Sequence, residues 1–265
     1  MNTRWAAAST AARLKNPTVF REKAYIDAQW LESLSSNNYG DRLMPRNVRR
    51  PCKMECPRLA QHSSRSSEDM NDAIEVAQRA FSTFQYTAPK ERARIVQKWS
   101  DLMIEHLKTL AEILMYENGR PIAGARQGIK SAAGFFDWFR CEAERSYNHT
   151  ASGTTSGNRV VTIQQPVGVV GVLTAWNFPS ATITRKVAGA IAAGCAIVLK
   201  AATETPYSAL ALAELGERAG VPKGMFNVVT TNELVQEVGT AITTRKDVKK
   251  TSFTGSTHVG KLLMA

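Results

Sequence analysis

The feature that most constrains the fold is a regular alternation of short apolar segments with helical segments after Pro166. Apolar runs of strand length predict four strands at 167–173, 196–200, 226–229 and 250–253. Helical periodicity predicts helices between them at 183–193, 208–219 and 234–243, with another beginning at 259–264. Apolar strands that alternate with helices form a parallel sheet covered on both faces, and nucleotides bind such sheets at the carboxyl ends of the strands.

Three amphipathic segments precede this alternation. Apolar residues recur at helical spacing after Ser67, which predicts a helix with Ser67 as its N-cap. Pro89 opens a second predicted helix that runs to Asn118, where a Gly-Arg-Pro sequence stops it. A third predicted helix begins at Ile122, and residues 159–165 are β-rich. The predicted fold class is therefore α/β, with a partial Rossmann-like parallel sheet preceded by a helical layer.

The net charge of +11 invites a nucleic-acid interpretation. Most of this charge, however, lies in two segments without helical or strand periodicity. Residues 1–21 carry four basic residues and no acid, and residues 34–67 carry seven basic residues against two acids. Because a binding face should belong to the folded part, we expect no nucleic-acid partner. A nucleic-acid binder would need an affinity that survives deletion of residues 1–67.

The cysteines and the apolar runs exclude several other classes. No apolar run is long enough to cross a membrane. The four cysteines, Cys52, Cys56, Cys141 and Cys195, lack the paired spacing of a zinc site and suggest no disulfide framework, so we expect no metal and a reducing compartment. The first 21 residues are basic and rich in Ala, Ser and Thr, as mitochondrial transit peptides are, and a frayed terminus explains them equally well. The expected location is the cytoplasm, with the mitochondrial matrix as an alternative.

Three segments that follow predicted strands carry groups suited to a nucleotide site. Asn177, in Ala-Trp-Asn-Phe-Pro, can aim its amide at a developing negative charge, or it can simply cap the next helix. Lys200 ends a strand where a ribose or phosphate would lie, although a surface Lys is the commoner explanation. Gly255 and Ser256 begin a helix whose free N–H groups suit a phosphate. Each segment alone is a weak signal, and the last is neither a P-loop nor a G-x-G-x-x-G fingerprint.

Together and in order, these segments resemble the aldehyde dehydrogenase superfamily. The chain has Gln-Pro-Val-Gly-Val at 165–169, Trp-Asn-Phe-Pro at 176–179, the strand ending at Lys200, Ala-Gly-Val-Pro-Lys-Gly-Met-Phe-Asn-Val-Val at 219–229, and Phe-Thr-Gly-Ser-Thr at 253–257. The resemblance is near-continuous from about residue 67 to residue 265, and residues 18–32 also fit. It implies attack of a Cys thiolate on an aldehyde, hydride transfer to NAD or NADP, and thioester hydrolysis assisted by a Glu.

The resemblance also implies roles for particular residues. Asn177 would be the oxyanion-hole amide, and Lys186 would support the polar network near it. The expected cofactor contacts are Trp176 in the cleft wall, Lys200 at the adenosine ribose, and Gly255 and Ser256 at the pyrophosphate.

Thr203 bears on the choice of cofactor. NAD-preferring members of the family commonly have Glu three residues after the Lys, and its carboxylate repels a 2′-phosphate. Thr203 carries no charge, so we expect NADP to be tolerated, although the neighbouring Glu204 could restore a preference for NAD.

Residues 180–186, Ser-Ala-Thr-Ile-Thr-Arg-Lys, resemble the succinate-semialdehyde dehydrogenase type within the family. Members that take neutral aldehydes usually have an aromatic residue where Arg185 stands. A guanidinium beside the substrate tunnel suits a distal carboxylate, whereas an ordinary exposed helix Arg needs no such role. We expect Phe178 to line the substrate site together with Arg185. The aromatic residues of 135–139 also resemble this subfamily, although core packing explains most of them equally well.

Several features depart from the family pattern. The sequence ends at Ala265, before the positions of the family's Glu and catalytic Cys, and none of the four cysteines fits the nucleophile's position. Residues 34–67 do not match the family's N-terminal β segment, Ala201 replaces a usual Pro, and His258 stands where Glu is common. We therefore expect an N-terminal extension with a disordered segment at 1–66, an incomplete cofactor-binding domain at 67–265 and no catalytic domain. By itself, the 265-residue chain should be inactive and marginally folded.

The predicted function is NAD(P)-dependent oxidation of succinate semialdehyde to succinate, as in 4-aminobutyrate degradation. One alternative is another aldehyde dehydrogenase, such as one for glutarate semialdehyde. A second is a non-catalytic short protein that binds nucleotide or partner subunits. The expected partners are a small-molecule semialdehyde and further copies of the chain in a dimer or tetramer, with neither nucleic acid nor membrane.

Overall fold

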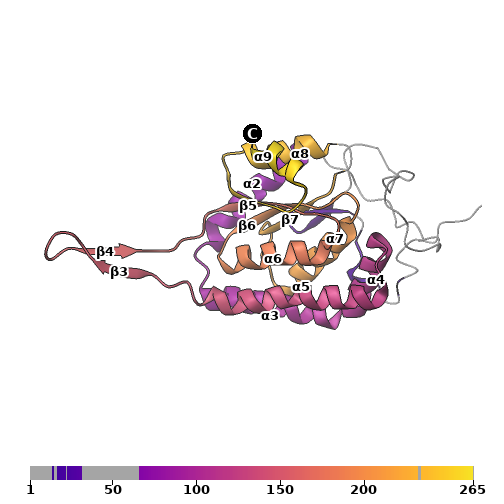
Figure 1. Cartoon of the computed structure of the whole chain (residues 1–265), viewed down its shortest axis with the longest axis horizontal. Helices are drawn as coiled ribbons and strands as arrows, with labels where there is room; N and C mark the ends of the chain where they lie inside the picture. Colours follow the sequence, from indigo (N-terminus) through magenta and orange to yellow (C-terminus); the bar gives the residue numbers. More distant parts are fainter. Residues whose placement is uncertain (1–13, 15–16, 22, 32–65, 232–233, 265) are drawn as a thin grey trace, which may run out of the picture.

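The computed structural model describes residues 14, 17–21, 23–31, 66–231 and 234–264, which form a mixed six-stranded sheet between layers of helices (Figure 1). The strand order is β2-β1-β7-β6-β5-β8, and β7, β6, β5 and β8 are parallel to one another. The expectations for residues 1–13 and 32–65 lie outside the described residues. The strands are β1 (Ala24–Ile26), β2 (Gln29–Leu31), β5 (Val169–Leu173), β6 (Ala196–Lys200), β7 (Phe226–Val229) and β8 (Val248–Phe253).

Each of the four predicted parallel strands is present. Strands β5, β6 and β7 are buried along their whole length, which explains their continuous apolar sequences. Strand β8 lies at the sheet edge and is partly exposed, in keeping with its lysines and threonine. The α/β fold class is therefore confirmed, with a sheet that is mixed rather than wholly parallel.

Strands β1 and β2 form an antiparallel pair that the sequence did not reveal. Tyr25 of β1 pairs with Val228 of β7, so this hairpin extends the sheet. The boundary expected at residue 66 therefore does not separate residues 24–31 from the sheet. Each strand has only three residues, too few for an alternation pattern. The turn residues Asp27 and Ala28 both have positive φ, but the pair lacks the Gly that usually marks such a turn.

Helices cover both faces of the sheet (Figure 1). On one face, α6 and α7 pack against the strands and are themselves covered by an outer layer of α3, α4 and α5. On the other face lie α2 and α8, with α9 beside α8. No helix among these described segments is long and apolar enough to cross a membrane. The helices are α2 (Ser67–Phe84), α3 (Pro89–Glu105), α4 (Leu107–Asn118), α5 (Ile122–Ala143), α6 (Pro179–Ala192), α7 (Pro206–Ala219), α8 (Val235–Thr244) and α9 (Thr257–Met264), preceded by a 3₁₀ turn, η1 (Pro17–Val19).

The helical layer differs from the prediction at two points. The N-cap of α2 is Ser66 rather than Ser67, because Ser66 and Asp69 form a reciprocal capping box. The helix predicted from Pro89 to Asn118 breaks at His106 into α3 and α4. Neither Gly nor Pro marks this break. It arises because α3 packs against α5, α6 and α7, whereas α4 turns toward η1 while packing against α5 and α7.

One hydrophobic core joins the helical layer to the sheet. The Trp99 ring of α3 lies 4.8 Å from the Phe136 ring of α5 and 5.5 Å from the Phe226 ring of β7, centroid to centroid. These three rings are almost fully buried. The outer helices are therefore fixed relative to the strands, and so are the loops that follow the strands.

A second, two-stranded sheet projects from the body of the molecule (Figure 1). Strand β3 (His149–Ser152) pairs antiparallel with β4 (Arg159–Thr162), and every residue of both strands is exposed. The sequence indicated the β-rich segment at 159–165 but not its partner, because His149–Ser152 has no apolar alternation.

Candidate active site and cofactor site

The four parallel strands end in register at one edge of the sheet. Leu173 of β5 pairs with Lys200 of β6 and with Phe253 of β8, and Lys200 pairs with Val229 of β7. The loops that follow these strands therefore leave the sheet along a single line. These loops carry Asn177, Thr203 and Gly255, so the structure brings the sequence motifs together at the carboxyl edge, where α/β sheets bind nucleotides.

The loop after β5 presents Asn177 to solvent. The N-cap of α6 is Phe178, whose backbone carbonyl accepts from the Thr182 N–H at 2.9 Å, and no side chain caps this helix. The capping role considered for Asn177 is therefore not seen, and Asn177 is exposed. Trp176 and Phe178, on either side of it, are 44% and 48% exposed. Three successive exposed side chains therefore lie close to the end of a buried strand, and such a surface suits a bound ligand.

Two residues that the sequence analysis missed hold this loop from the α4–α5 turn. The Asn118 side-chain amide donates to the Trp176 carbonyl at 2.9 Å, and the Arg120 guanidinium donates to the Asn177 carbonyl at 3.0 Å. The Arg120 guanidinium also lies over the Phe178 ring, 4.2 Å from its centroid. In the sequence, residues 118–121 indicated only the end of a helix, so nothing there pointed to these contacts.

Glu117, one residue earlier, is also buried and was missed. Its carboxylate accepts from the Tyr207 N–H at 2.9 Å and from the Ser208 N–H and hydroxyl, so it caps the start of α7. Burial raises the pKa of Glu117 to about 7, and the hydrogen bonds from Ser208 and Tyr207 oppose that rise. A charged Glu beside a helix N-terminus is favourable, but burial is the larger influence here.

Lys200 is buried at the end of β6, with 7% of its surface exposed. Its ammonium makes a long, 3.5 Å hydrogen bond to the Thr203 hydroxyl and no ion pair within the described part of the chain. Burial lowers the pKa of Lys200 to about 8, and the negative charge of Glu204 opposes that fall. The commoner explanation of Lys200 as a solvated surface residue is therefore wrong. Among the described residues nothing else accepts from this ammonium, so two of its three donor positions are available to a ligand.

The Thr203 hydroxyl is partly committed. It donates to the Thr231 carbonyl at 2.9 Å, which ties the loop after β6 to the loop after β7. Nearby, the Thr205 and Thr231 hydroxyls are buried, and within the described residues neither has a hydrogen-bond partner. Among the described residues around Lys200, the ammonium thus has no ion-pair partner and two buried hydroxyls have no hydrogen-bond partner.

Ser256 caps α9 and leaves the first turn of that helix open. Its hydroxyl accepts from the Val259 N–H at 3.3 Å, and both Gly255 and Ser256 are exposed. A Cβ at Gly255 would lie 2.4 Å from the Phe253 ring, so a larger residue would displace that ring. Gly255 therefore lets the loop pass close to Phe253 of the sheet, and the residues that begin α9 are exposed, which suits a phosphate at a helix N-terminus.

Lys186 and Arg185 lie on α6, which the Asn177 loop precedes. The Lys186 ammonium donates to the Ser252 hydroxyl of β8 at 3.3 Å. Among the described residues, its hydrogen bond therefore goes to Ser252 and not to Asn177. Burial, and to a smaller extent the charge of Arg185, lowers the pKa of Lys186. Arg185 is exposed and lies over the Phe135 ring at 5.1 Å, which connects it to the aromatic run on α5.

Neither described cysteine lies at this edge. Cys195 directly precedes β6, so it is buried at the opposite end of that strand from Lys200. Cys141 lies in α5 and is partly buried, while Cys52 and Cys56 fall outside the described residues. The described residues contain no group of three or more metal-ligating His, Cys, Asp or Glu side chains.

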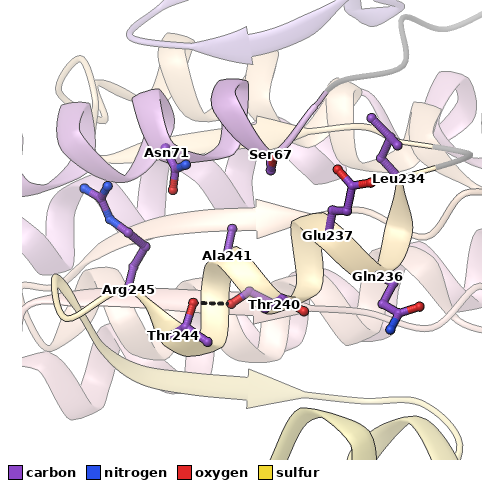
Figure 2. A pocket seen from close by; sticks show the side chains of 9 residues that line it. All are labelled: Ser67, Asn71, Leu234, Gln236, Glu237, Thr240, Ala241, Thr244 and Arg245. Atoms are coloured by element: carbon purple, nitrogen blue, oxygen red, sulfur yellow. Dashed lines mark hydrogen bonds between the residues drawn. The ribbon is translucent and has the colours of Figure 1, made fainter.

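A hollow of about 620 Å³ lies elsewhere, between α2 and α8 (Figure 2). Arg245 at its end forms ion pairs with Glu75 at 3.2 Å and with Asp247 at 2.9 Å. None of the predicted site residues lines this hollow, so it is separate from the cofactor position. Its lining residues are Ser67, Asn71, Leu234, Gln236, Glu237, Thr240, Ala241, Thr244 and Arg245.

Comparison with known proteins agrees with the geometry. Residues 46–265 match the aldehyde dehydrogenase family, so the match includes part of the 34–67 segment that was expected to depart from it. The chain is 43% identical over 253 residues to a glutarate-semialdehyde dehydrogenase of Pseudomonas aeruginosa, covering 96% of this chain and 50% of that protein. It is 42% identical over 251 residues to an NADP(+) succinate-semialdehyde dehydrogenase of Saccharomyces cerevisiae, covering 95% and 48%.

Comparison with solved structures also indicates the aldehyde dehydrogenase fold. The crystal structure of succinate-semialdehyde dehydrogenase from Burkholderia pseudomallei superimposes with a TM-score of 0.86 at 41% identity. The superposition covers 95% of this chain and 50% of that one. The chain thus spans about half the length of the curated relatives it matches.

Proposed function

Because the chain belongs to the aldehyde dehydrogenase family, we propose that its function is the NAD(P)-dependent oxidation of succinate semialdehyde to succinate. The observation that carries the proposal is the convergence of an exposed Asn177 with a buried Lys200 at one edge of a parallel sheet. The first supplies a donor for a developing oxyanion, and the second a cation for the cofactor.

The residues around Lys200 fit a dinucleotide. The ammonium lacks an ion-pair partner among the described residues, and the nearby buried hydroxyls of Thr205 and Thr231 lack hydrogen-bond partners there. Ribose hydroxyls or a 2′-phosphate would pair with the ammonium, and the buried hydroxyls add polarity behind it. Gly255 and Ser256 would hold the pyrophosphate at the start of α9. When bound, NAD or NADP would supply the hydride acceptor. The similarity to the Saccharomyces enzyme that is named for NADP(+) supports NADP as the cofactor.

The proposed roles of the chain's own residues at the aldehyde follow from their positions. Asn177 donates a hydrogen bond to the oxygen on which negative charge develops, and Trp176 covers the cofactor beside it. Lys186, which is partly buried and bound to Ser252, connects the middle of α6 to the edge strand β8.

Substrate choice would depend on the carboxylate at the far end of the semialdehyde. Arg185 is exposed on α6 with its guanidinium already ordered over Phe135, so it can pair with a carboxylate at little entropic cost. Phe178 would line the apolar part of the same path. Glutarate semialdehyde carries the same carboxylate with one more methylene, and the similarity to the Pseudomonas enzyme makes it the second candidate substrate. One methylene changes specificity by only about 10- to 200-fold.

The non-catalytic alternative, a short protein that binds nucleotide or partner subunits, also has a supporting observation. Neither described cysteine lies at the carboxyl edge of the sheet, so neither can attack an aldehyde held by Asn177. Cofactor binding and turnover must therefore be measured separately.

The experiment is a paired assay of binding and oxidation. NAD and NADP binding is measured by calorimetry on the 265-residue chain and, where the reading frame continues past Ala265, on the longer product. Each form is then assayed with succinate semialdehyde, glutarate semialdehyde and acetaldehyde. The proposal expects cofactor binding by both forms, and oxidation by the longer one with at least about tenfold higher kcat/KM for succinate semialdehyde than for acetaldehyde.

Two results would contradict parts of the proposal. If neither form binds NAD or NADP, the proposed function is wrong. If the Arg185→Leu variant prefers carboxylate-bearing aldehydes as strongly as the exposed control Arg126→Leu does, Arg185 is not the specificity residue. Binding without oxidation by any form would favour the non-catalytic alternative.

A further inference from the structure

The end of α4 and the turn after it contact one loop at the carboxyl edge of the sheet and the first turn of α7. We refer to residues 117–120 as the brace. Glu117 holds the start of α7, which follows the Lys200 loop, while Asn118 and Arg120 hold the loop that carries Asn177. Four consecutive residues therefore connect the proposed cofactor site with the proposed oxyanion donor. In sequence they are separated from their partners in the Asn177 loop and in α7 by 57 to 91 positions.

Side chains of the brace contact the backbone of the Asn177 loop, so they leave the Asn177 side chain available to a ligand. The two carbonyls that accept are those of Trp176 and Asn177 themselves, at 2.9 Å and 3.0 Å. Fixing both peptide groups around Asn177 fixes the direction in which its Cα–Cβ bond points. The Arg120 guanidinium adds a contact with the Phe178 ring, so three successive loop residues are held by two side chains.

The brace is itself anchored at two of its residues, Glu117 and Gly119. Gly119 adopts a left-handed conformation with φ of 72°, and its N–H donates to the Met115 carbonyl, which ends α4 at a fixed residue. Glu117 is buried against α7 with three donors on its carboxylate. A segment anchored in this way can transmit its own rigidity to the exposed loop, which provides no side-chain cap for α6.

We propose that Arg120 and Asn118 are positioning residues, which hold the Asn177 amide in the orientation required to stabilise the oxyanion. The proposal rests on the proposed function for its catalytic consequence, but not for the brace itself. Donors in an oxyanion hole are effective because they are oriented before the reaction, and removing one costs about 100- to 1000-fold in kcat. Loosening the loop should cost part of that factor, because a misplacement of about 1 Å is enough to slow catalysis strongly.

The first test follows the loop directly and needs no turnover. The 265-residue chain has five tryptophans, one of which is Trp176, and it is labelled with 5-fluorotryptophan for ¹⁹F NMR. The Trp176→Phe variant assigns the Trp176 resonance. Arg120→Met keeps an apolar stem of similar length but removes the guanidinium, and Asn118→Ala removes the amide donor. The matched control is Arg126→Met, because Arg126 is an exposed residue on α5.

We expect the Trp176 resonance to shift and broaden in Arg120→Met and in Asn118→Ala, while those of Trp99 and Trp138 stay in place. Arg120→Lys, which keeps a donor but not the planar stacking group, should give an intermediate spectrum. Arg126→Met should match the wild type. An unchanged Trp176 resonance in both Arg120→Met and Asn118→Ala would overturn the proposal. So would a simultaneous shift of all resonances, because that would mark a general role in folding.

The second test measures catalysis in whichever form of the protein oxidises semialdehydes. Arg120→Met should lower kcat about 10- to 100-fold while KM changes less than about threefold, with Arg120→Lys between it and the wild type. An equal kcat in Arg120→Met and wild type would overturn the catalytic part. If no form oxidises an aldehyde, the proposed function fails, and the fluorine spectra still decide whether the brace orders the loop.

Discussion

Lys200 and Thr203 dominate the electrostatics of the proposed cofactor position at the scale of single residues. Lys200 is buried without an ion pair among the described residues, and its pKa is lowered to about 8. The Thr203 hydroxyl accepts from Lys200 and donates to the Thr231 carbonyl, so it adds polarity without adding negative charge. The pair should therefore attract a 2′-phosphate at neutral pH, where Lys200 is mostly protonated.

The affinity for NADP should fall as pH rises through about 8. In the folded chain the Lys200 ammonium loses its proton near that pH, because its pKa lies well below the ordinary value of 10.5, so the attraction is present below pH 8 and lost above it. We expect the Kd for NADP, measured by calorimetry, to be about tenfold larger at about pH 9.5 than at about pH 7. Lys200→Met should bind weakly at every pH, and the exposed control Lys223→Met should follow the wild type. A Lys200→Met variant with the wild-type pH dependence would contradict this assignment.

Substituting Thr203 by Glu should select against NADP. A carboxylate three residues after Lys200 would repel a 2′-phosphate by on the order of 1–2 kcal/mol, which corresponds to roughly tenfold in Kd. Binding of NAD should change much less. Calorimetric Kd values for both cofactors check this, with Glu204→Gln as the variant that tests the neighbouring carboxylate. A preference for NAD above about a hundredfold in the wild type, unchanged by Thr203→Glu, would exclude Thr203 as the discriminating residue.

At the scale of elements, the start of α7 depends on a carboxylate from another helix. Glu117 of α4 replaces the side-chain cap that α7 lacks, and it connects the outer helical layer to the helix that packs on the sheet. Its raised pKa means that the folded chain binds the proton more tightly than the unfolded chain. Between the ordinary value of 4.5 and about 7, stability therefore decreases as pH rises.

We expect Glu117 to reduce the free energy of unfolding by up to roughly 3 kcal/mol as pH rises from about 4.5 to about 7. Urea unfolding followed by circular dichroism at several pH values measures this. Glu117→Gln cannot ionise, so its stability should depend less on pH across that interval. Glu105→Gln, on the exposed end of α3, is the matched control. Parallel pH profiles for wild type and Glu117→Gln would show that Glu117 titrates near its ordinary pKa instead.

The whole molecule is a layered body with one projecting hairpin (Figure 1). Strands β3 and β4 carry exposed apolar side chains, with Val160 and Val161 at 54% and 63% exposure. An extended pair of strands with uncovered valines and open edges is costly in a monomer and suits burial against another chain. We therefore propose that the expected homo-oligomer forms through the hairpin.

Charge on the hairpin should therefore weaken association. We expect wild-type protein to sediment as a dimer or tetramer, and the double substitution Val160→Lys with Val161→Lys to shift it toward monomer at micromolar concentration. Circular dichroism should be unchanged, because the hairpin contributes nothing to the core. The control places a charge change on α5 with Lys130→Glu. A wild-type monomer, or a double variant with unchanged mass, would contradict the proposal.

The sequence by itself determined the parallel strands of the sheet and indicated the segments proposed to form the site. Continuous apolar strands and periodic helices are local signals, so β6 and β7 could be predicted to the residue, whereas β5 begins at Val169 rather than 167 and α6 at Pro179 rather than 183. The motifs at Asn177, Lys200 and Gly255 could be predicted as well, because each lies at or directly after the end of a strand. Parallel topology then requires these strand ends to share one edge.

Only the tertiary structure decided what has no local signal. The β1–β2 hairpin, the break at His106 and the brace each depend on a partner distant in sequence. In the sequence, Arg120 is only a charged residue between two helices. In the fold its guanidinium donates to the Asn177 carbonyl, 57 residues away. The burial of Lys200 and Glu117, and hence their altered pKa values, likewise arises from the packing of several elements. Local periodicity specifies which face of an element is apolar, but contacts between loops depend on how all the elements pack together.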